Sequence, residues 1–64
     1  MARYEHANGE VIEATGTRYQ VLNALGEVVR GADISRWADD AEKWIDNDLK
    51  DGYYAGFVKV ATTA

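Results

Sequence analysis

The sequence predicts a small α+β domain, in which an antiparallel sheet of four to five strands is covered on one face by a single amphipathic helix in the order ββββαβ. Three observations support this fold class. One long stretch has helical periodicity, short stretches rich in β-branched and aromatic residues lie on both sides of it, and glycine and asparagine separate those stretches. The 64 residues are enough for one domain, 1–64, with a modest core.

The segment from Ile34 to Lys50 is predicted to form the helix. Asp33 is the expected N-cap, because its carboxylate can accept a hydrogen bond from a free amide of the first turn. Gly52 is expected to end the helix in the left-handed conformation. The apolar residues recur at intervals of three and four, which is the spacing of one helical face: Ile34, Trp37, Ala38, Ala41, Trp44, Ile45 and Leu49.

Strands are predicted on both sides of this helix. Asn8-Gly9 is a two-residue hairpin signal, because both positions of a type I′ turn need positive φ. Gly16 and the segment 23–26 mark two further turns. Gly56, inside the last strand, indicates a bulge or the close approach of another backbone. The expected strands are Arg3–His6, Glu10–Thr15, Thr17–Leu22, Glu27–Arg30 and Tyr53–Val60.

The helix is expected to turn its apolar side, with both tryptophans, toward the sheet. No register cleanly separates the apolar from the polar side chains of the first hairpin, so the buried face of that hairpin is left open. The sheet residues expected to face the helix are Tyr19, Val21, Val28, Val58 and Val60.

The composition excludes several classes of protein. Without cysteine there is no disulfide scaffold, no Cys-based zinc finger and no thiol nucleophile. His6 is the only imidazole and Ser35 the only serine, and no spacing pairs either of them with a catalytic partner, so we expect no enzyme, no catalytic residue and no cofactor. No apolar run approaches the roughly 18 residues of a membrane-spanning helix and no signal-peptide pattern is present, so a cytoplasmic location without membrane contact is expected.

The acid-rich run Asp46–Gly52 has the composition of a calcium loop but not its spacing. An EF-hand loop places acids at alternate positions, glycine at the sixth and glutamate at the twelfth. Here Lys50 takes the fifth position, Gly52 the seventh and Phe57 the twelfth. No metal site is therefore predicted.

The net charge of −4 comes entirely from one segment. Residues Asp33–Asp51 include seven acidic and three basic side chains, whereas the rest of the chain has four of each. Asp39, Glu42 and Asp46 are expected to form a row along one side of the helix, because they are three and four residues apart. The candidate partner-binding residues are Asp39, Asp40, Glu42, Asp46 and Asp48.

Two interpretations of these acids are open. One is a solvated helix face, partly neutralised by Arg36 and by the pairs Asp39–Lys43 and Asp46–Lys50. The other is a surface for a basic partner, because acids near a helix C-terminus oppose the macrodipole and positions that break a local rule tend to be functional. Carboxylates one turn apart, about 5 Å, are spaced on the scale of nucleic-acid phosphates.

Direct binding of RNA or DNA is not favoured. The predicted sheet carries aromatic and basic residues, but its net charge is zero and it contains no RNP-type string.

The run Tyr19–Val29, followed by Ala38, Ala41, Trp44 and Ile45 on a helix, is similar to the strand–turn–strand–helix core of many short phage and mobile-element proteins. In size, acidity and lack of catalytic residues the chain resembles anti-CRISPR proteins, some of which are small α+β domains that mimic nucleic acid. The resemblance implies an inhibitor, and it carries over no site residue because that group shares no motif.

We therefore predict a non-enzymatic binding protein whose acidic helix meets a basic surface on a nucleic-acid-handling complex and inhibits it by competition. The alternative is a small structural or regulatory homodimer, paired through the last strand or the first one. The sequence leaves open whether the protein is a monomer or a homodimer.

Overall fold

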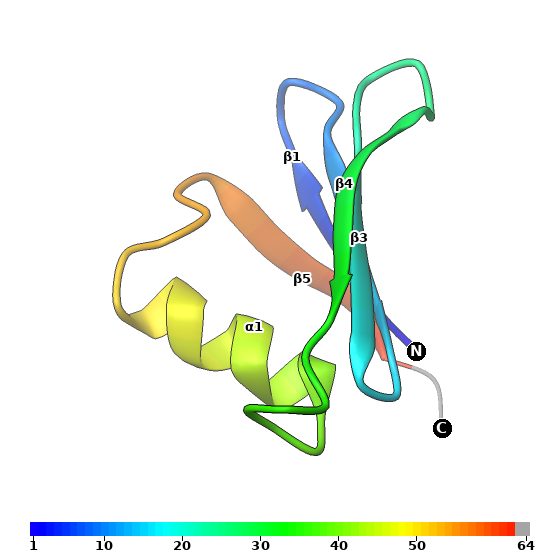
Figure 1. The fold of residues 1–64 in the computed structure, drawn as a ribbon. Helices are drawn as coiled ribbons and strands as arrows, with labels where there is room; N and C mark the ends of the chain where they lie inside the picture. The colour runs from blue at the N-terminus through cyan, green and yellow to red at the C-terminus, as the bar shows by residue number, and fades with distance from the viewer. Residues whose placement is uncertain (63–64) are drawn as a thin grey trace.

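The computed structural model describes residues 1–62, which form one five-stranded antiparallel sheet and one helix (Figure 1). The predicted α+β class and the order ββββαβ are confirmed. Across the sheet the strands follow the order β4-β3-β2-β1-β5, so β4 and β5 form the two edges. The elements are β1 (Ala2–His6), β2 (Val11–Thr15), β3 (Arg18–Leu22), β4 (Val28–Asp33), α1 (Ala41–Lys50) and β5 (Phe57–Thr62). Because β1 lies between β2 and β5, the first strand cannot pair across a two-fold axis.

One face of the sheet packs on α1, and the other face is open. In the first hairpin Tyr4 pairs with Ile12 and Ala2 with Ala14, so these four buried side chains share the face toward the helix. The register that the sequence left open is thereby settled. The core is made of Ala2, Tyr4, Ile12, Ala14, Val21, Ile34, Ala41 and Ile45.

The loop between β1 and β2 differs from the prediction. It has three residues, 7–9, because Gly9 N–H donates to His6 O (2.9 Å) and His6 N–H to Glu10 O (3.0 Å). Only the glycine has a positive φ, 95°, so the expected type I′ turn at Asn8-Gly9 is wrong. Asn8 instead holds the loop through its side chain, whose Oδ1 accepts from Glu10 N–H at 2.9 Å.

The helix begins at Ala41 rather than at Ile34, and its N-cap is Asp40 rather than Asp33. Asp40 has an extended backbone, and its carboxylate accepts from Glu42 N–H at 3.0 Å. The N–H of Ala41 donates to Gly16 O at 2.8 Å, which ties the first helical residue to the β2–β3 turn. Aspartate favours caps over helix interiors, and this tertiary hydrogen bond decides which of the aspartates becomes the cap. Asp33 accepts from Ser35 N–H in a separate turn (2.9 Å).

The C-terminus of α1 confirms the prediction for Gly52. This glycine has φ 92°, and its N–H donates to Leu49 O at 3.2 Å. The N–H of Tyr53 donates to Asp48 O at 2.8 Å. The two bonds form a Schellman motif, which uses carbonyls that the helix leaves free.

The residues that face the helix were predicted correctly for Tyr19 and Val21 only. Trp37 precedes α1 and is 66% exposed, whereas Trp44 is half-buried. Val28 is also exposed, and it lies on the open face. The pairing of Lys59 with Tyr4 places Lys59 on the helix side of β5 and leaves Val58 and Val60 exposed.

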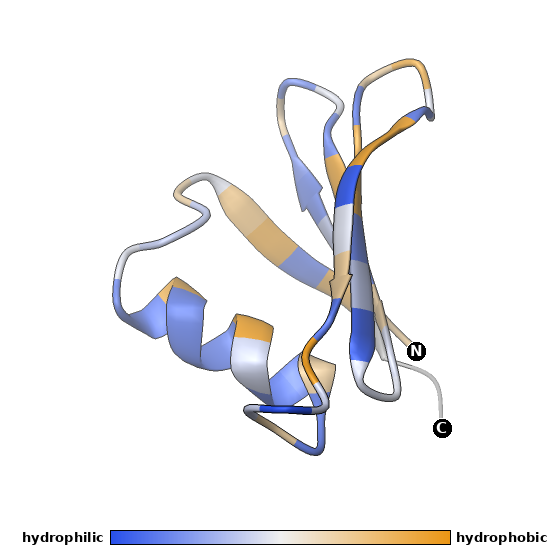
Figure 2. Ribbon diagram, in the orientation of Figure 1, coloured by the Kyte–Doolittle hydropathy of each residue, from blue (hydrophilic) through white to orange (hydrophobic). Residues whose placement is uncertain are grey.

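The segment Tyr53–Gly56 is a turn and not the start of the last strand. Phe57 N–H donates to Tyr54 O at 3.1 Å, and Gly56 has φ 91°. The close approach predicted at Gly56 exists, but it comes from a side chain, because a Cβ there would overlap the ring of His6. Figure 2 shows hydrophobic residues on both edge strands, at the start of β4 and along β5.

Candidate functional site

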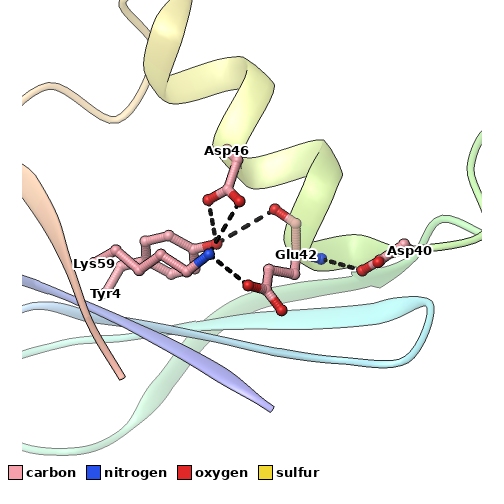
Figure 3. A network of polar contacts seen from close by, with 5 residues as sticks. All are labelled: Tyr4, Asp40, Glu42, Asp46 and Lys59. Atoms are coloured by element: carbon pink, nitrogen blue, oxygen red, sulfur yellow. Dashed lines mark hydrogen bonds and ion pairs between the residues drawn. The ribbon is translucent and has the colours of Figure 1, made fainter. Parts of the chain in front are cut away.

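Two of the predicted acids meet a basic residue of the sheet. Lys59, in β5, extends beneath α1, where Nζ lies 3.0 Å from Asp46 Oδ2 and forms an ion pair with Glu42 (Figure 3). The hydrogen bond to Glu42 raises the pKa of Lys59, and Asp46 adds to this effect. One ammonium group therefore serves two carboxylates of the helix.

Tyr4, in β1, also belongs to this network. Its hydroxyl donates to Asp46 Oδ1 at 2.8 Å and lies 3.3 Å from the carbonyl oxygen of Glu42 (Figure 3). Burial raises the pKa of Tyr4, and the hydrogen bond to Asp46 raises it further. Lys59 Nζ is 5.9 Å from the centre of the Tyr4 ring, a cation–π distance. We call Tyr4, Glu42, Asp46 and Lys59 the β5–α1 network.

The other three predicted acids lie outside this network. Asp40 is occupied as the N-cap (Figure 3). Asp39 precedes the helix and is exposed, so the row that was predicted to begin at Asp39 does not form. Asp48 is half-buried near the C-terminus of α1, where burial and the neighbouring charge of Asp51 raise its pKa.

The exposed positions of α1 carry no acid, and its three acids are half-buried. The exposed residues are Lys43, Asn47 and Lys50. None of the ion pairs within the described residues contains Lys43 or Lys50, so the pairs expected with Asp39 and Asp46 do not form there. The five acids are thus distributed over the N-terminal end and the flanks of the helix, and they do not form one continuous outward face.

Sequence reasoning missed Lys59 as the cation that the helix acids use. It lies 13 residues beyond Asp46 in the chain, and the residues four apart on the helix were the nearer candidates. The alternation Val58-Lys59-Val60 could have indicated this role. Successive side chains of a strand point to opposite faces, so a lysine whose two neighbours lie on the open face points toward the helix.

The ion pairs on the open face of the sheet join two arginines to three carboxylates. Arg3 binds Glu5 at 2.9 Å and Glu13 at 3.4 Å, and Arg18 lies 3.5 Å from Asp33. The segment 39–51 has six acidic and two basic side chains, so most of the negative surplus lies on the helix side of the molecule.

The lone histidine has a structural role. His6 Nδ1 accepts from Asn8 N–H at 3.0 Å, and its ring makes an edge contact with Phe57, with 5.1 Å between ring centroids. Within residues 1–62 no group of three or more His, Asp or Glu side chains could hold a metal ion. The helix of this part of the chain is too short and too polar to cross a membrane.

The chain matches no family model, no curated protein and no solved structure.

Proposed function

We propose that this chain is a non-enzymatic binding protein that presents its acidic segment 39–51 to a basic surface on a nucleic-acid-handling partner and inhibits that partner by competition. The observation that carries the proposal is the separation of charge. On the open face two arginines bind three carboxylates, whereas the segment 39–51 has six acids and only two lysines. Such a surplus attracts a cationic surface and speeds association with it.

Some acids of this segment can contact a partner without giving up an interaction that stabilises the fold. Asp39 and Asp51 are exposed, and no hydrogen bond or ion pair of the described residues engages their carboxylates. Glu42 and Asp46 belong to the same segment but also hold Lys59. Asp40 is needed as the cap. We therefore propose that Asp39 and Asp51 make the contact and that the β5–α1 network borders it.

The test compares two charge-reversal variants with equal net charge. Asp39→Lys/Asp51→Lys changes the acidic segment, and Glu10→Lys/Glu27→Lys changes the residues that follow the two hairpin loops instead. Each protein is immobilised and incubated with a nuclease-treated bacterial lysate at low and high salt. Thermal denaturation of both variants verifies that they are folded.

We expect wild type and the hairpin variant to retain the same protein at low salt, and the acidic-segment variant to lose it. Added duplex DNA or RNA should release the retained protein, because the acidic segment and the nucleic acid compete for one basic surface. Equal retention by both variants, or retention that nucleic acid does not reduce, would contradict the proposal. An anti-CRISPR type of inhibitor stays a prediction within this proposal.

A further inference from the structure

Strand β4 is exposed along its whole length. All six residues of Val28–Asp33 are solvent-exposed, and none belongs to the core. The helix packs mainly on β2 and leaves this edge uncovered (Figure 1). Val28 and Val29 are 57% and 56% exposed, which is unusual for valines in a sheet.

The two edge strands carry their inward-pointing basic residues at different places. An inward-pointing charged residue on an edge strand opposes pairing with another chain, because the added strand would cover that charge. Lys59 is such a residue, and the register of β5 also shifts between Arg3 and Tyr4. In β4 the register shift lies next to Val28, and the inward-pointing residue Arg30 pairs with the buried Val21. The stretch Gly31–Asp33 that follows pairs regularly with β3 and holds no inward-pointing charge.

One hydrogen bond fixes which groups of β4 point outward. Ile34 N–H donates to Thr17 O at 2.8 Å. In an antiparallel ladder, hydrogen-bonded and non-hydrogen-bonded pairs alternate, so Ala32 and Arg30 bond to β3. Gly31 and Asp33 therefore direct their N–H and C=O groups to the free edge.

We propose that a second copy of this chain pairs with β4 through its own β4, antiparallel, with Ala32 on the two-fold axis. In this register Gly31 of each copy lies opposite Asp33 of the other, and the outward groups of both residues form four backbone hydrogen bonds. Ala32 suits the axis, because a non-hydrogen-bonded pair brings side chains close together. Gly31 has no side chain and leaves room for the Asp33 carboxylate of the second copy.

The surface around Gly31 agrees with this arrangement. A shallow concavity of about 490 Å³ lies on the open face over β2, β3 and β4, and its lining includes Gln20, Gly31 and Asp33. In the proposed register, Asp33 of the second copy lies beside this concavity. The carboxylate keeps its own chain's Thr17 hydroxyl at 3.1 Å and Arg18 at 3.5 Å, so it needs no new cation.

A second copy fits this edge better than an arbitrary strand for two reasons. The outward residues are placed symmetrically about Ala32, as a self-complementary two-fold interface requires. A small domain whose described residues bury only eight hydrophobic side chains also gains stability from added backbone pairing. A standard interface covers about 800 Å² per partner, and the whole chain exposes 4311 Å². Pairing of one edge strand covers less than the standard area, so we expect a reversible dimer with a dissociation constant on the order of 10–100 µM.

The test is sedimentation velocity, or light scattering, between roughly 1 µM and 1 mM protein, a range that brackets the expected constant. The variants are Ala32→Lys and Ala32→Glu, which place like charges opposite each other on the axis. Each should weaken dimerisation roughly tenfold or more. An equimolar mixture of the two should restore a heterodimer, and this result also shows that both variants are folded. The control is Val58→Lys on β5, a position that is 64% exposed.

Three results would overturn the proposal: a wild-type monomer at the highest concentration, a dimer that neither Ala32 variant weakens, and a dimer that Val58→Lys disrupts while the Ala32 variants do not. The last result would place a dimer on the β5 edge. The proposed function is tested separately, because its variants lie in the segment 39–51 and not in β4.

Discussion

The two edge strands of the sheet have similar sequences and different surroundings. Each contains one basic residue flanked by small or apolar ones, Arg30 in β4 and Lys59 in β5. Lys59 lies beneath the helix and binds two of its carboxylates, whereas Arg30 reaches only the ring of Tyr54, 5.9 Å from its centroid. The difference follows from strand order. β5 adjoins β1, which contributes buried residues to the core, and β4 lies beyond the part of the sheet that α1 covers. A strand's own residues therefore do not decide whether its edge is protected.

The largest expected effect on the free energy of unfolding is at two glycines, one near each edge strand of the sheet. Gly56, before β5, and Gly26, before β4, have φ of 91° and 84°. A Cβ at Gly56 meets the His6 ring, and a Cβ at Gly26 meets no atom within 4 Å. We expect Gly56→Ala to lower the free energy of unfolding by about 2 kcal/mol and Gly26→Ala by about 1 kcal/mol.

Urea denaturation measures both values. Adding His6→Ala to Gly56→Ala should recover part of the loss, because the obstructing ring is removed. Equal losses at the two glycines would mean that backbone strain alone, and not the packing of β5 on His6, sets the cost.

The next effect concerns the two basic residues. We expect Lys59→Met to lower the free energy of unfolding by about 1 kcal/mol, because two carboxylates lose their shared cation. Arg30→Met, the matched change in β4, should cost less than about 0.5 kcal/mol. Thermal denaturation of both variants at neutral pH makes the comparison, and a loss at Arg30 as large as at Lys59 would contradict it.

The Lys59 contribution should also depend on pH. Because the folded protein raises the pKa of Lys59 above its ordinary 10.5, the stabilisation is fully present below that value. It is lost as the pH rises through the raised pKa. On the alkaline side, the stability difference between wild type and Lys59→Met should therefore narrow above pH 10.5.

The smallest effect concerns Asp48, an acid that the β5–α1 network does not engage. Burial and Asp51 raise its pKa above the ordinary 3.8, so its ionised form costs stability at neutral pH. We expect Asp48→Asn to stabilise the protein at pH 7 by about 0.3 kcal/mol, since solvent screens most of the repulsion. The gain should disappear below pH 3.8, where Asp48 is protonated in both states. Asp39→Asn is the control, and an equal gain there would show that net charge alone is responsible.

Local patterns predicted the parts of the fold that depend on local interactions. The helix and its C-terminus could be predicted, because apolar periodicity and Gly52 act within a few residues of each other. The helix start could not, because the choice of Asp40 over Asp33 depends on the hydrogen bond between Ala41 and Gly16, which are distant in sequence. The exposure of Trp37 follows from the same choice.

The candidate site also combines features that depend on local sequence with features that depend on contacts between distant residues. The sequence located the acids on the helix segment, but it did not show which of them the fold uses. Lys59 reaches Glu42 and Asp46 because the register of β5 on β1, which shifts between Arg3 and Tyr4, sets Lys59 opposite Tyr4. A register shift of this kind is decided by pairing between the first and last strands, which the helix pattern cannot report.

The strand order also has a consequence for how the chain folds. Strands β1 to β4 form a meander in which each strand pairs with its neighbour in sequence, whereas β5 returns to β1, so that Ala2 pairs with Thr62. Contacts between distant residues require a large loop to close, which costs chain entropy and slows folding. We expect the meander to form first, with β5 and Lys59 completing the sheet in the rate-limiting step. Until that step, the unpaired edge that is vulnerable to aggregation is β1, a strand that is interior in the finished molecule.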